Sequence, residues 1–322
     1  MTPPSSPGLP PLDGRTRWRV LVSGASGFIG TALSKSLRAG GHDVVRLTRS
    51  ATGAGDIAWD PDEGELDAGR LEGVDAIVHL AGEPVAERWT SEHKRRVRDS
   101  RVGGTALLAT AVATLARPPR VMVSASAVGF YGNGGDRLLD ERSASGEGFL
   151  AQVAREWEGA AEPARGRGVR LVRTRFGVIL SPHGGALAKL LPVFQLGAGG
   201  RLGDGKQWMS WISLTDTLRA LHFALATDSL TGAVNVVGPS PATNAEFSRA
   251  LGHVLSRPVL AAVPAFAVRL VFGEMADDVL LAGQRVLPRA LMEAGFEFVH
   301  PTLEEALRAE LATRGTGGGG RE

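Results

Sequence analysis

The segment from Val20 to Gly30 (VLVSGASGFIG) constrains the fold of this chain more than any other stretch. A short apolar run stops at three glycines spaced three residues apart, and the amphipathic stretch TALSKSLRAGG follows. This order predicts a strand, a tight turn and a helix. Glycine stands where the backbone bends, where a pyrophosphate approaches the main chain and where the helix packs on the strand. The N-terminus of such a helix offers free N–H groups and a positive dipole end to phosphates.

A glycine-rich turn alone is weak evidence, because ordinary loops contain the same glycines. Here a strand pattern precedes the turn, a helix pattern follows it, and a second strand pattern begins at Asp43. These neighbours favour a dinucleotide-binding loop. We expect it to contact the cofactor through Gly24, Ser26, Gly27, Phe28, Ile29 and Gly30.

Strand-like and helical segments alternate along the chain. The strand-like runs lie at 18–23, 43–48, 75–80, 120–125, 169–175 and 233–237, and the clearest helical patterns at 91–116 and 147–162. This alternation predicts an α/β fold of the Rossmann type, a doubly wound parallel sheet with right-handed crossovers. From about Ser181 a glycine-rich stretch loosens the pattern, so we expect a smaller mixed C-terminal lobe.

The expected domain boundaries follow from these patterns. Residues 1–16 are rich in proline and residues 311–322 in glycine, so both ends are predicted to be flexible tails. The dinucleotide-binding domain should comprise 17–180 and 211–240, and the substrate-side lobe 181–210 and 241–310. In folds of this type a ligand binds at the carboxyl ends of the strands.

Composition excludes several classes of function. The 322 residues include no cysteine, which removes disulfides, thiolate metal sites and a cysteine nucleophile. The seven histidines show no metal-like spacing, and a net charge of +2 gives little support for nucleic-acid binding. No stretch approaches the ~18 apolar residues of a membrane span. We expect a cytoplasmic protein that acts on a small molecule without a metal, nucleic acid or membrane, and we allow for a homodimer.

The residues after the second strand indicate which dinucleotide binds. An NAD site usually has an acidic residue there, whereas this chain has Thr48, Arg49 and Ser50. No carboxylate repels a 2′-phosphate, and Arg49 can pair with one, so NADP(H) is the predicted cofactor. The alternative is that Arg49 is a solvated surface residue. The third central strand ends in Leu80, Ala81 and Gly82, whose small size would let the backbone run beneath the cofactor, although a simple strand-end turn looks similar.

Several segments resemble known proteins. GASGFIG, HLAG, VMVSASAVGFYG and RTRFGVIL resemble the extended short-chain dehydrogenase/reductase superfamily. HLAGEPVAERW, RRVRDSRVGGT, GGRLGDGKQWMSWI, TNAEF and GQRVLPRALMEAGF resemble an atypical subgroup, the predicted nucleoside-diphosphate-sugar epimerases with a small C-terminal domain. The resemblance covers about residues 18–310. It implies a Rossmann fold that binds NADP(H), with Ile179 among the cofactor contacts, and it supplies no substrate.

The superfamily's usual chemistry implies a Ser or Thr together with a Tyr and a Lys four residues apart on a helix. The lysine lowers the pKa of the tyrosine, which passes a proton to or from the substrate oxygen. The single tyrosine of this chain is Tyr131, and its four lysines are Lys35, Lys94, Lys189 and Lys206, so the pair cannot occur. Phe149 and Val153 occupy the expected places on the corresponding helix and should continue an apolar stripe with Trp157.

Three other residues are candidates for the reaction. By the resemblance, Ser126 matches the hydroxyl that binds the reacting oxygen, with Ser124 two residues before it. The alternative is that Ser126 satisfies a turn backbone. Tyr131 is the only phenol available for proton transfer, and a structural role is equally open to it. Lys189 should lie on a lobe helix that faces the site.

Arg101 stands where extended members of the superfamily usually carry Asn. Helical spacing places it on an apolar stripe with Val97 and Leu108, and a buried arginine needs an anion or several acceptors. The cofactor or an acidic substrate could serve, and an internal Asp or Glu is the rival partner. Its neighbours Arg95, Arg96 and Arg98 are expected to form a solvated face.

Polar and aromatic residues of the second lobe complete the candidates. Gln207, Trp208, Ser210 and Trp211 could stack on or orient a ligand, although tryptophans more often anchor a core. Asp216 is expected to be a helix N-cap or a first-turn acid without a catalytic role.

These observations predict an NADP(H)-dependent oxidoreductase or epimerase-like enzyme. Its substrate would be a small carbonyl or hydroxyl compound or a nucleotide-sugar-like compound. The alternative, favoured by the missing Tyr/Lys pair, is a catalytically silent NADP(H)-binding protein that senses redox state or regulates a partner.

Overall fold

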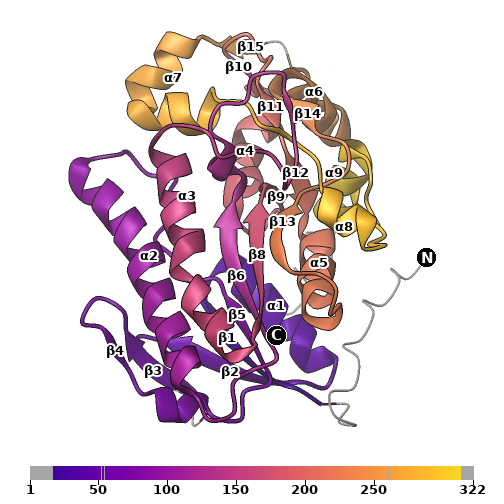
Figure 1. Cartoon of the computed structure of the whole chain (residues 1–322). Helices are drawn as coiled ribbons and strands as arrows, with labels where there is room; N and C mark the ends of the chain where they lie inside the picture. The colour runs from indigo at the N-terminus through magenta and orange to yellow at the C-terminus, as the bar shows by residue number, and fades with distance from the viewer. Residues whose placement is uncertain (1–16, 52, 54, 260, 313–322) are drawn as a thin grey trace, which may run out of the picture.

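The computed structural model describes residues 17–51, 53, 55–259 and 261–312 (Figure 1). Its centre is an eight-stranded sheet whose neighbours are parallel except for the last pair, which is antiparallel. The spatial order is β13 (Gly232–Val236), β8 (Arg170–Phe176), β6 (Val121–Ala127), β5 (Ala76–His79), β1 (Arg19–Ser23), β2 (Asp43–Thr48), β3 (Ile57–Asp60) and β4 (Glu65–Leu66). The predicted Rossmann-type α/β fold is confirmed.

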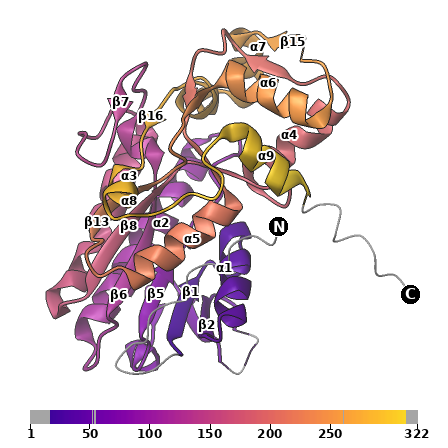
Figure 2. The same cartoon turned by 90° about the vertical axis from the view of Figure 1, so that its right-hand side faces the viewer.

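Helices cover both faces of this sheet (Figures 1 and 2). Side chains alternate along each strand, so Val20 and Val22 of β1 belong to one buried cluster and Leu21 to another. The first cluster includes side chains of α1 (Phe28–Ala39) and α5 (Leu214–Ala226), and the second side chains of α2 (Ser91–Thr114). α3 (Phe149–Ala160) packs against α2. Burial on both faces explains why the central strands are apolar almost throughout.

The remaining elements form the smaller lobe and the connections. Four short strand pairs lie outside the main sheet: β9 (Val178–Leu180) with β12 (Trp211–Ser213), β10 (Gly200–Leu202) with β15 (Ala261–Val263), β11 (Trp208–Met209) with β14 (Ala242–Thr243), and β7 (Leu138–Leu139) with β16 (Arg285–Val286). The helices are α4 (Gly185–Gln195), α6 (Asn244–Leu255), α7 (Ala265–Phe272), α8 (Arg289–Glu293) and α9 (Leu303–Ala312). Short 3₁₀ or π turns cover η1 (Ala68–Leu71), η2 (Val128–Tyr131), η3 (Glu162–Arg167) and η4 (Ala276–Leu280).

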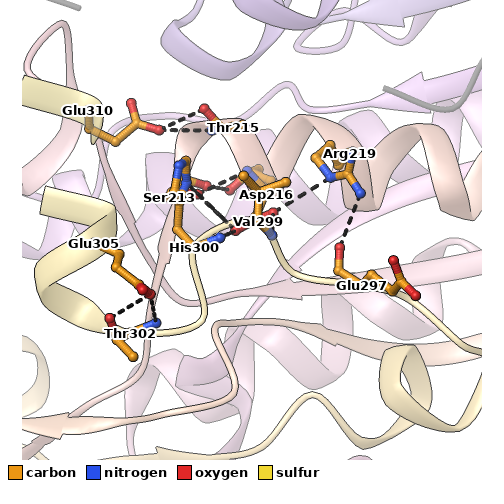
Figure 3. Close-up of polar contacts among 11 residues, drawn as sticks. Ser213, Thr215, Asp216, Arg219, Glu297, Val299, His300, Thr302, Glu305 and Glu310 are labelled. Carbon is orange, nitrogen blue, oxygen red and sulfur yellow. Dashed lines mark hydrogen bonds and ion pairs between the residues drawn. The ribbon is translucent and has the colours of Figure 1, made fainter. Parts of the chain in front are cut away.

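A buried carboxylate fastens the C-terminal segment to the sheet domain (Figure 3). Asp216, in the first turn of α5, accepts hydrogen bonds from the backbone N–H groups of Val299 and His300, each at 2.9 Å. Ser213 caps the same helix by accepting from the N–H of Asp216 at 3.0 Å. Of the two expected alternatives, Asp216 is the first-turn acid and not the N-cap. It also binds the backbone of residues 299–300.

The observed boundaries differ from the expected ones in a few places. The antiparallel pair β3 and β4 at the sheet edge was not predicted, because each strand is too short to show a clear period. The tails expected at 1–16 and 311–322 lie outside the described residues, except that α9 continues to Ala312. Within the described part, no helix is long and apolar enough to cross a membrane.

Candidate functional site

The loop between β1 and α1 packs so tightly on its surroundings that one position in the loop and one in the first turn of α1 admit only glycine. Gly24 has φ +64°, and a Cβ built on it would lie 2.8 Å from the carbonyl carbon of Leu80. A Cβ on Gly30 would lie 2.2 Å from the carbonyl oxygen of Gly24. Gly27 precedes α1 and provides no side-chain cap, and the first turn of the helix holds no acid. The helix N-terminus is therefore available to an anion.

A groove of about 560 Å³ lies beside this loop. It is bounded by the glycine loop, the end of β2, the turn after β5 and the first turns of α2. Eight of the predicted cofactor residues line it: Gly24, Ser26, Gly27, Thr48, Arg49, Leu80, Ala81 and Gly82. The groove therefore brings together three segments that are far apart in the sequence.

The other predicted cofactor residues do not line this groove. Phe28 faces α4, since a Cβ built on Gly184 would lie 2.7 Å from its ring. Ile179 is 8% exposed and belongs to the buried cluster that includes Val20 and Val22 of β1. Ile29 packs against the same cluster. Gly30 provides the close contact between helix and loop described above.

The charges in the groove are distributed unequally. Arg46 points its guanidinium at Asp56 through two hydrogen bonds of 2.8 and 2.6 Å, which raise its pKa and commit its charge. Arg96 contacts Glu92 at 3.0 Å. Arg49 and Arg95 are exposed and form no hydrogen bond or ion pair with the residues that the structure describes. These two cations remain available to a phosphate.

The contribution of α2 to the groove was missed from the sequence. Arg95 and Arg96 are exposed, as expected, and both also line the groove, which was not predicted. The 24-residue α2 begins at Ser91, and residues of its first turns line the groove. The dense run of arginines there was the available signal.

A buried hydrogen-bond chain holds the turn after β5. The hydroxyl of Ser23 accepts from the backbone N–H groups of Leu80 and Ala81 at 3.0 and 3.2 Å, and lies 2.6 Å from Nδ1 of His79. Since two donors occupy its oxygen, this hydroxyl donates to Nδ1, and Nε2 carries the ring hydrogen. Nε2 lies 2.9 Å from the hydroxyl of Thr105. Burial lowers the pKa of His79 to about 4, so the ring is neutral at pH 7.

Arg101 satisfies its charge within the protein. Its Nη1 donates to the backbone carbonyls of Glu83 and Val97 at 2.8 and 3.1 Å, and its guanidinium lies 5.1 Å from the ring centre of Trp157. Burial lowers its pKa to about 10, against the opposing attraction of Glu83. The expected need for several acceptors is thus met by backbone oxygens. A Cβ on Gly82 would lie 3.2 Å from Cζ, so this glycine lets the arginine pass under the turn.

Ser126, at the end of β6, belongs to a second buried network. Its hydroxyl donates to Oε1 of Glu158 at 2.8 Å. The same carboxylate receives Nε and Nη2 of Arg175 at 2.7 and 2.8 Å. Arg175 continues through Nη1 to the hydroxyl of Tyr131 at 2.9 Å, and Tyr131 donates to Oδ1 of Asn235 at 2.7 Å. All five side chains are buried, so the network joins the ends of β6, β8 and β13 through α3.

The model of the NAD dependent epimerase/dehydratase family matches residues 20–238, and a domain of unknown function matches residues 263–310. The chain belongs to the NAD dependent epimerase/dehydratase family. An epimerase family protein of Mycobacterium tuberculosis is 48% identical over 89% of this chain and 96% of that protein. The human epimerase family protein SDR39U1 is 39% identical over 91% of this chain and 100% of its own.

Solved structures agree with this family assignment. The crystal structure of human SDR39U1 with NADPH superposes with a TM-score of 0.84 at 37% identity, over 91% of this chain and 99% of that one. A nucleoside-diphosphate sugar epimerase of Corynebacterium glutamicum gives 0.76 at 36% identity, over 92% of this chain and 59% of that one. The predicted resemblance to atypical epimerases with a small C-terminal domain is confirmed.

Compared with the Tyr/Lys pattern of the wider superfamily, α3 of this epimerase family member has apolar residues facing β6. Leu150 points at the turn after β6, since a Cβ on Gly129 would lie 3.3 Å from its Cβ. Phe149 stacks edge-to-face on Trp89 with ring centres 5.2 Å apart. Val153 is buried, as the expected apolar stripe requires.

The two remaining proton-transfer candidates differ in accessibility. Burial raises the pKa of Tyr131 to about 12, although Arg175 opposes the shift, and both of its hydrogen-bond partners are internal. Lys189 is exposed on α4, and its amine donates to the carbonyl of Ala86 at 3.3 Å. Of the two, Lys189 is accessible to a ligand, whereas the contacts of Tyr131 are those of a structural residue.

Proposed function

We propose that this chain is an NADP(H)-dependent oxidoreductase or epimerase-like enzyme. Its substrate would be a small carbonyl or hydroxyl compound or a nucleotide-sugar-like compound. The observation that carries the proposal is the groove beside the glycine loop, which ends in Arg49 without a carboxylate partner. The NADPH bound to human SDR39U1 supports the same cofactor for this relative. When bound, the nicotinamide supplies or removes a hydride.

The residues of the groove fit such a cofactor. The close approach of Gly24 and Gly30 to neighbouring backbone leaves the N-terminus of α1 open to a pyrophosphate. Arg49 and Arg95 are cations without a partner among the described residues, and they suit a 2′-phosphate. The Ser23–His79 chain keeps the turn at Leu80 in the position that forms the groove wall.

Ser126 is the proposed contact to the reacting oxygen. Its hydroxyl hydrogen points to Glu158, so its oxygen lone pairs are left to accept from a substrate hydroxyl. A proton released by that substrate could pass to the hydroxyl oxygen while the hydroxyl hydrogen moves to the carboxylate. Water would take the proton onward, because Tyr131 is committed to Arg175 and Asn235.

Cofactor binding is the first test. We expect NADPH to bind more tightly than NADH, measured by calorimetric titration. Arg49→Gln should raise the NADPH dissociation constant by about tenfold and leave NADH unchanged, since a charge-assisted hydrogen bond contributes about 1.5–3 kcal/mol. Arg38→Gln, an exposed arginine at the end of α1, is the matched control. Equal loss of both cofactors in Arg49→Gln would refute the assigned contact.

Hydride transfer is the second test. Deuterium-labelled NADPH is incubated with panels of carbonyl compounds and nucleotide sugars, and label transfer is followed by mass spectrometry. Ser126→Ala should lower turnover by 10²-fold or more without changing NADPH affinity, and Tyr131→Phe should keep most of the activity. Transfer that Ser126→Ala leaves intact would remove Ser126 from the mechanism.

One observation favours a second candidate, a catalytically silent NADP(H)-binding sensor. The hydroxyl of Ser126 and the phenol of Tyr131 both end on buried internal partners. This candidate predicts tight NADPH binding without label transfer to any compound, and a protein partner whose affinity differs between NADPH and NADP⁺. Transfer to a single substrate would exclude it.

A further inference from the structure

Arg285, on β16, is a half-buried arginine that makes no hydrogen bond or ion pair with the described residues. Its Nε is shielded from solvent and makes no hydrogen bond. Neither terminal nitrogen forms a hydrogen bond or ion pair within the part of the chain that the structure describes, and both remain open to solvent. The guanidinium lies 4.3 Å from the ring centre of Trp208. A shielded N–H without an acceptor is costly, and the two open terminal nitrogens leave the guanidinium free to bind an anion.

Nearby arginines do not share this feature. Arg289, four residues further on, pairs with Asp140 at 2.9 Å and with Glu293 at 2.7 Å. Arg142 also reaches Glu293, at 3.3 Å. Acids are thus available in this region and satisfy the exposed arginines, yet none of the described ones lies within ion-pair distance of Arg285.

Neighbouring hydrogen bonds fix the position of Arg285. Ser210 donates its hydroxyl to the carbonyl of Gln284 at 2.7 Å and accepts from the N–H of Val286 at 2.9 Å. The N–H of Gln284 donates to the carbonyl of Trp208 at 3.1 Å. The backbone on both sides of Arg285 is therefore tied to the strand that carries the tryptophan, so the arginine is preorganised for a ligand.

Arg285 also lies next to the reacting end of the sheet. β16 pairs with β7 in parallel, and the two lie side by side (Figure 2). The side chain of Gln284 donates to the carbonyl of Gly132 at 3.0 Å. Gly132 directly follows η2, which itself follows the strand that ends near Ser126. In open α/β sheets ligands bind outside the carboxyl ends of the strands, and Arg285 borders that region.

We propose that Arg285 and Trp208 bind an oxyanion of the substrate, a phosphate or a carboxylate. This inference rests on the proposed function, because it places the anion on the substrate side of the same sheet edge. Nη1 and Nη2 donate to two oxygens of the anion. The Trp208 ring, oriented by its Nε1 hydrogen bond of 2.8 Å to Asp136, lies against the guanidinium and holds it. A neutral aldehyde or free sugar offers no group for this site.

The test is calorimetric titration of protein saturated with NADP⁺, so that probes cannot occupy the cofactor's own phosphate sites. The probes are UDP, inorganic pyrophosphate and glucuronate. We expect millimolar or tighter binding of at least one probe, weakened tenfold or more by Arg285→Gln. Arg285→Lys should fall between, because lysine keeps the charge and loses the planar fork. Arg308→Gln, an exposed arginine of α9 paired with Glu304, should match wild type.

Each outcome has a distinct meaning. Binding of UDP and pyrophosphate alone identifies a phosphate, and binding of glucuronate alone a carboxylate. Wild-type protein that binds none of the probes, or Arg285→Gln protein that binds them as wild type does, overturns the inference. Unchanged NADPH affinity and melting temperature in Arg285→Gln show that the variant is folded. Wild-type protein that fails to bind NADPH would refute the proposed function instead.

Discussion

Replacing Glu158 by glutamine should destabilise this protein far more than replacing an exposed acid on the same helix. Glu158 and Arg175 are 5% and 4% exposed, and the carboxylate accepts two hydrogen bonds from the guanidinium and one from Ser126. Burial lowers the pKa of Arg175, but the hydrogen bond and charge of Glu158 outweigh burial, so its pKa is raised and it stays charged. Glutamine would leave that charge buried without a counter-charge.

The expected magnitude follows from this geometry. Breaking a buried ion pair by removing one charge costs about 3–5 kcal/mol of unfolding free energy. For a chain of this size the loss corresponds to a decrease in melting temperature on the order of 10 °C. Glu156→Gln is the matched control, because that side chain is 27% exposed and pairs with Arg98 near the surface. Its loss should be about 1 kcal/mol or less.

The assay is urea and thermal unfolding of both variants, followed by circular dichroism. A further variant, Glu158→Leu combined with Arg175→Met, should recover part of the loss, since it removes both buried charges. Equal stability of Glu158→Gln and Glu156→Gln would refute the buried network. The network would also be refuted if the double variant lost more unfolding free energy than Glu158→Leu and Arg175→Met lose separately, added together.

Three further predictions concern the site. Burial lowers the pKa of His79 to about 4 in the fold, against about 6.5 in the unfolded chain, so the unfolded state binds more protons between these pH values. The free energy of unfolding should therefore fall by roughly 3 kcal/mol as the pH decreases from 6.5 to 4. His79→Asn should remove this pH dependence, measured by urea unfolding at several pH values. Tyr131→Phe removes an acceptor from Arg175 and should cost about 1–3 kcal/mol in the same assay, and an unchanged stability would contradict its structural role. Gly30→Ala should prevent NADPH binding or folding, because its Cβ would lie 2.2 Å from a carbonyl oxygen. Gly103→Ala, at an open position of α2, is the control and should leave the melting temperature unchanged or slightly raised.

Much of the fold could be predicted because its signals are local. The glycines that bend the backbone stand within seven residues of one another, at positions 24–30. Six strands of the central sheet are apolar runs that stand out in the sequence, and all six begin within one residue of the expected start. The groove lining from the glycine loop, the end of β2 and the turn after β5 followed from the same local reasoning.

The catalytic candidates could not be evaluated in this way. Ser126 was matched by its place on a strand, and nothing near it in the sequence shows that its hydroxyl meets Glu158, 32 residues later. Tyr131 meets Asn235 across 104 residues, and this contact decides between a proton donor and a structural residue. Arg95 is exposed, as expected, but only the assembled domain places it at the border of the groove.

The sequence by itself determined the parallel α/β sheet, the glycine loop and the absence of a Tyr-x-x-x-Lys pair, because each depends on neighbouring residues or on residue types. Tertiary structure decided which polar side chains remain available. Arg46 and Arg49 lie three residues apart and both line the groove, yet Asp56 binds the guanidinium of Arg46 and not that of Arg49. The same holds for Arg285, which forms no ion pair with the described acidic residues. Availability depends on contacts between distant segments, and those exist only after folding.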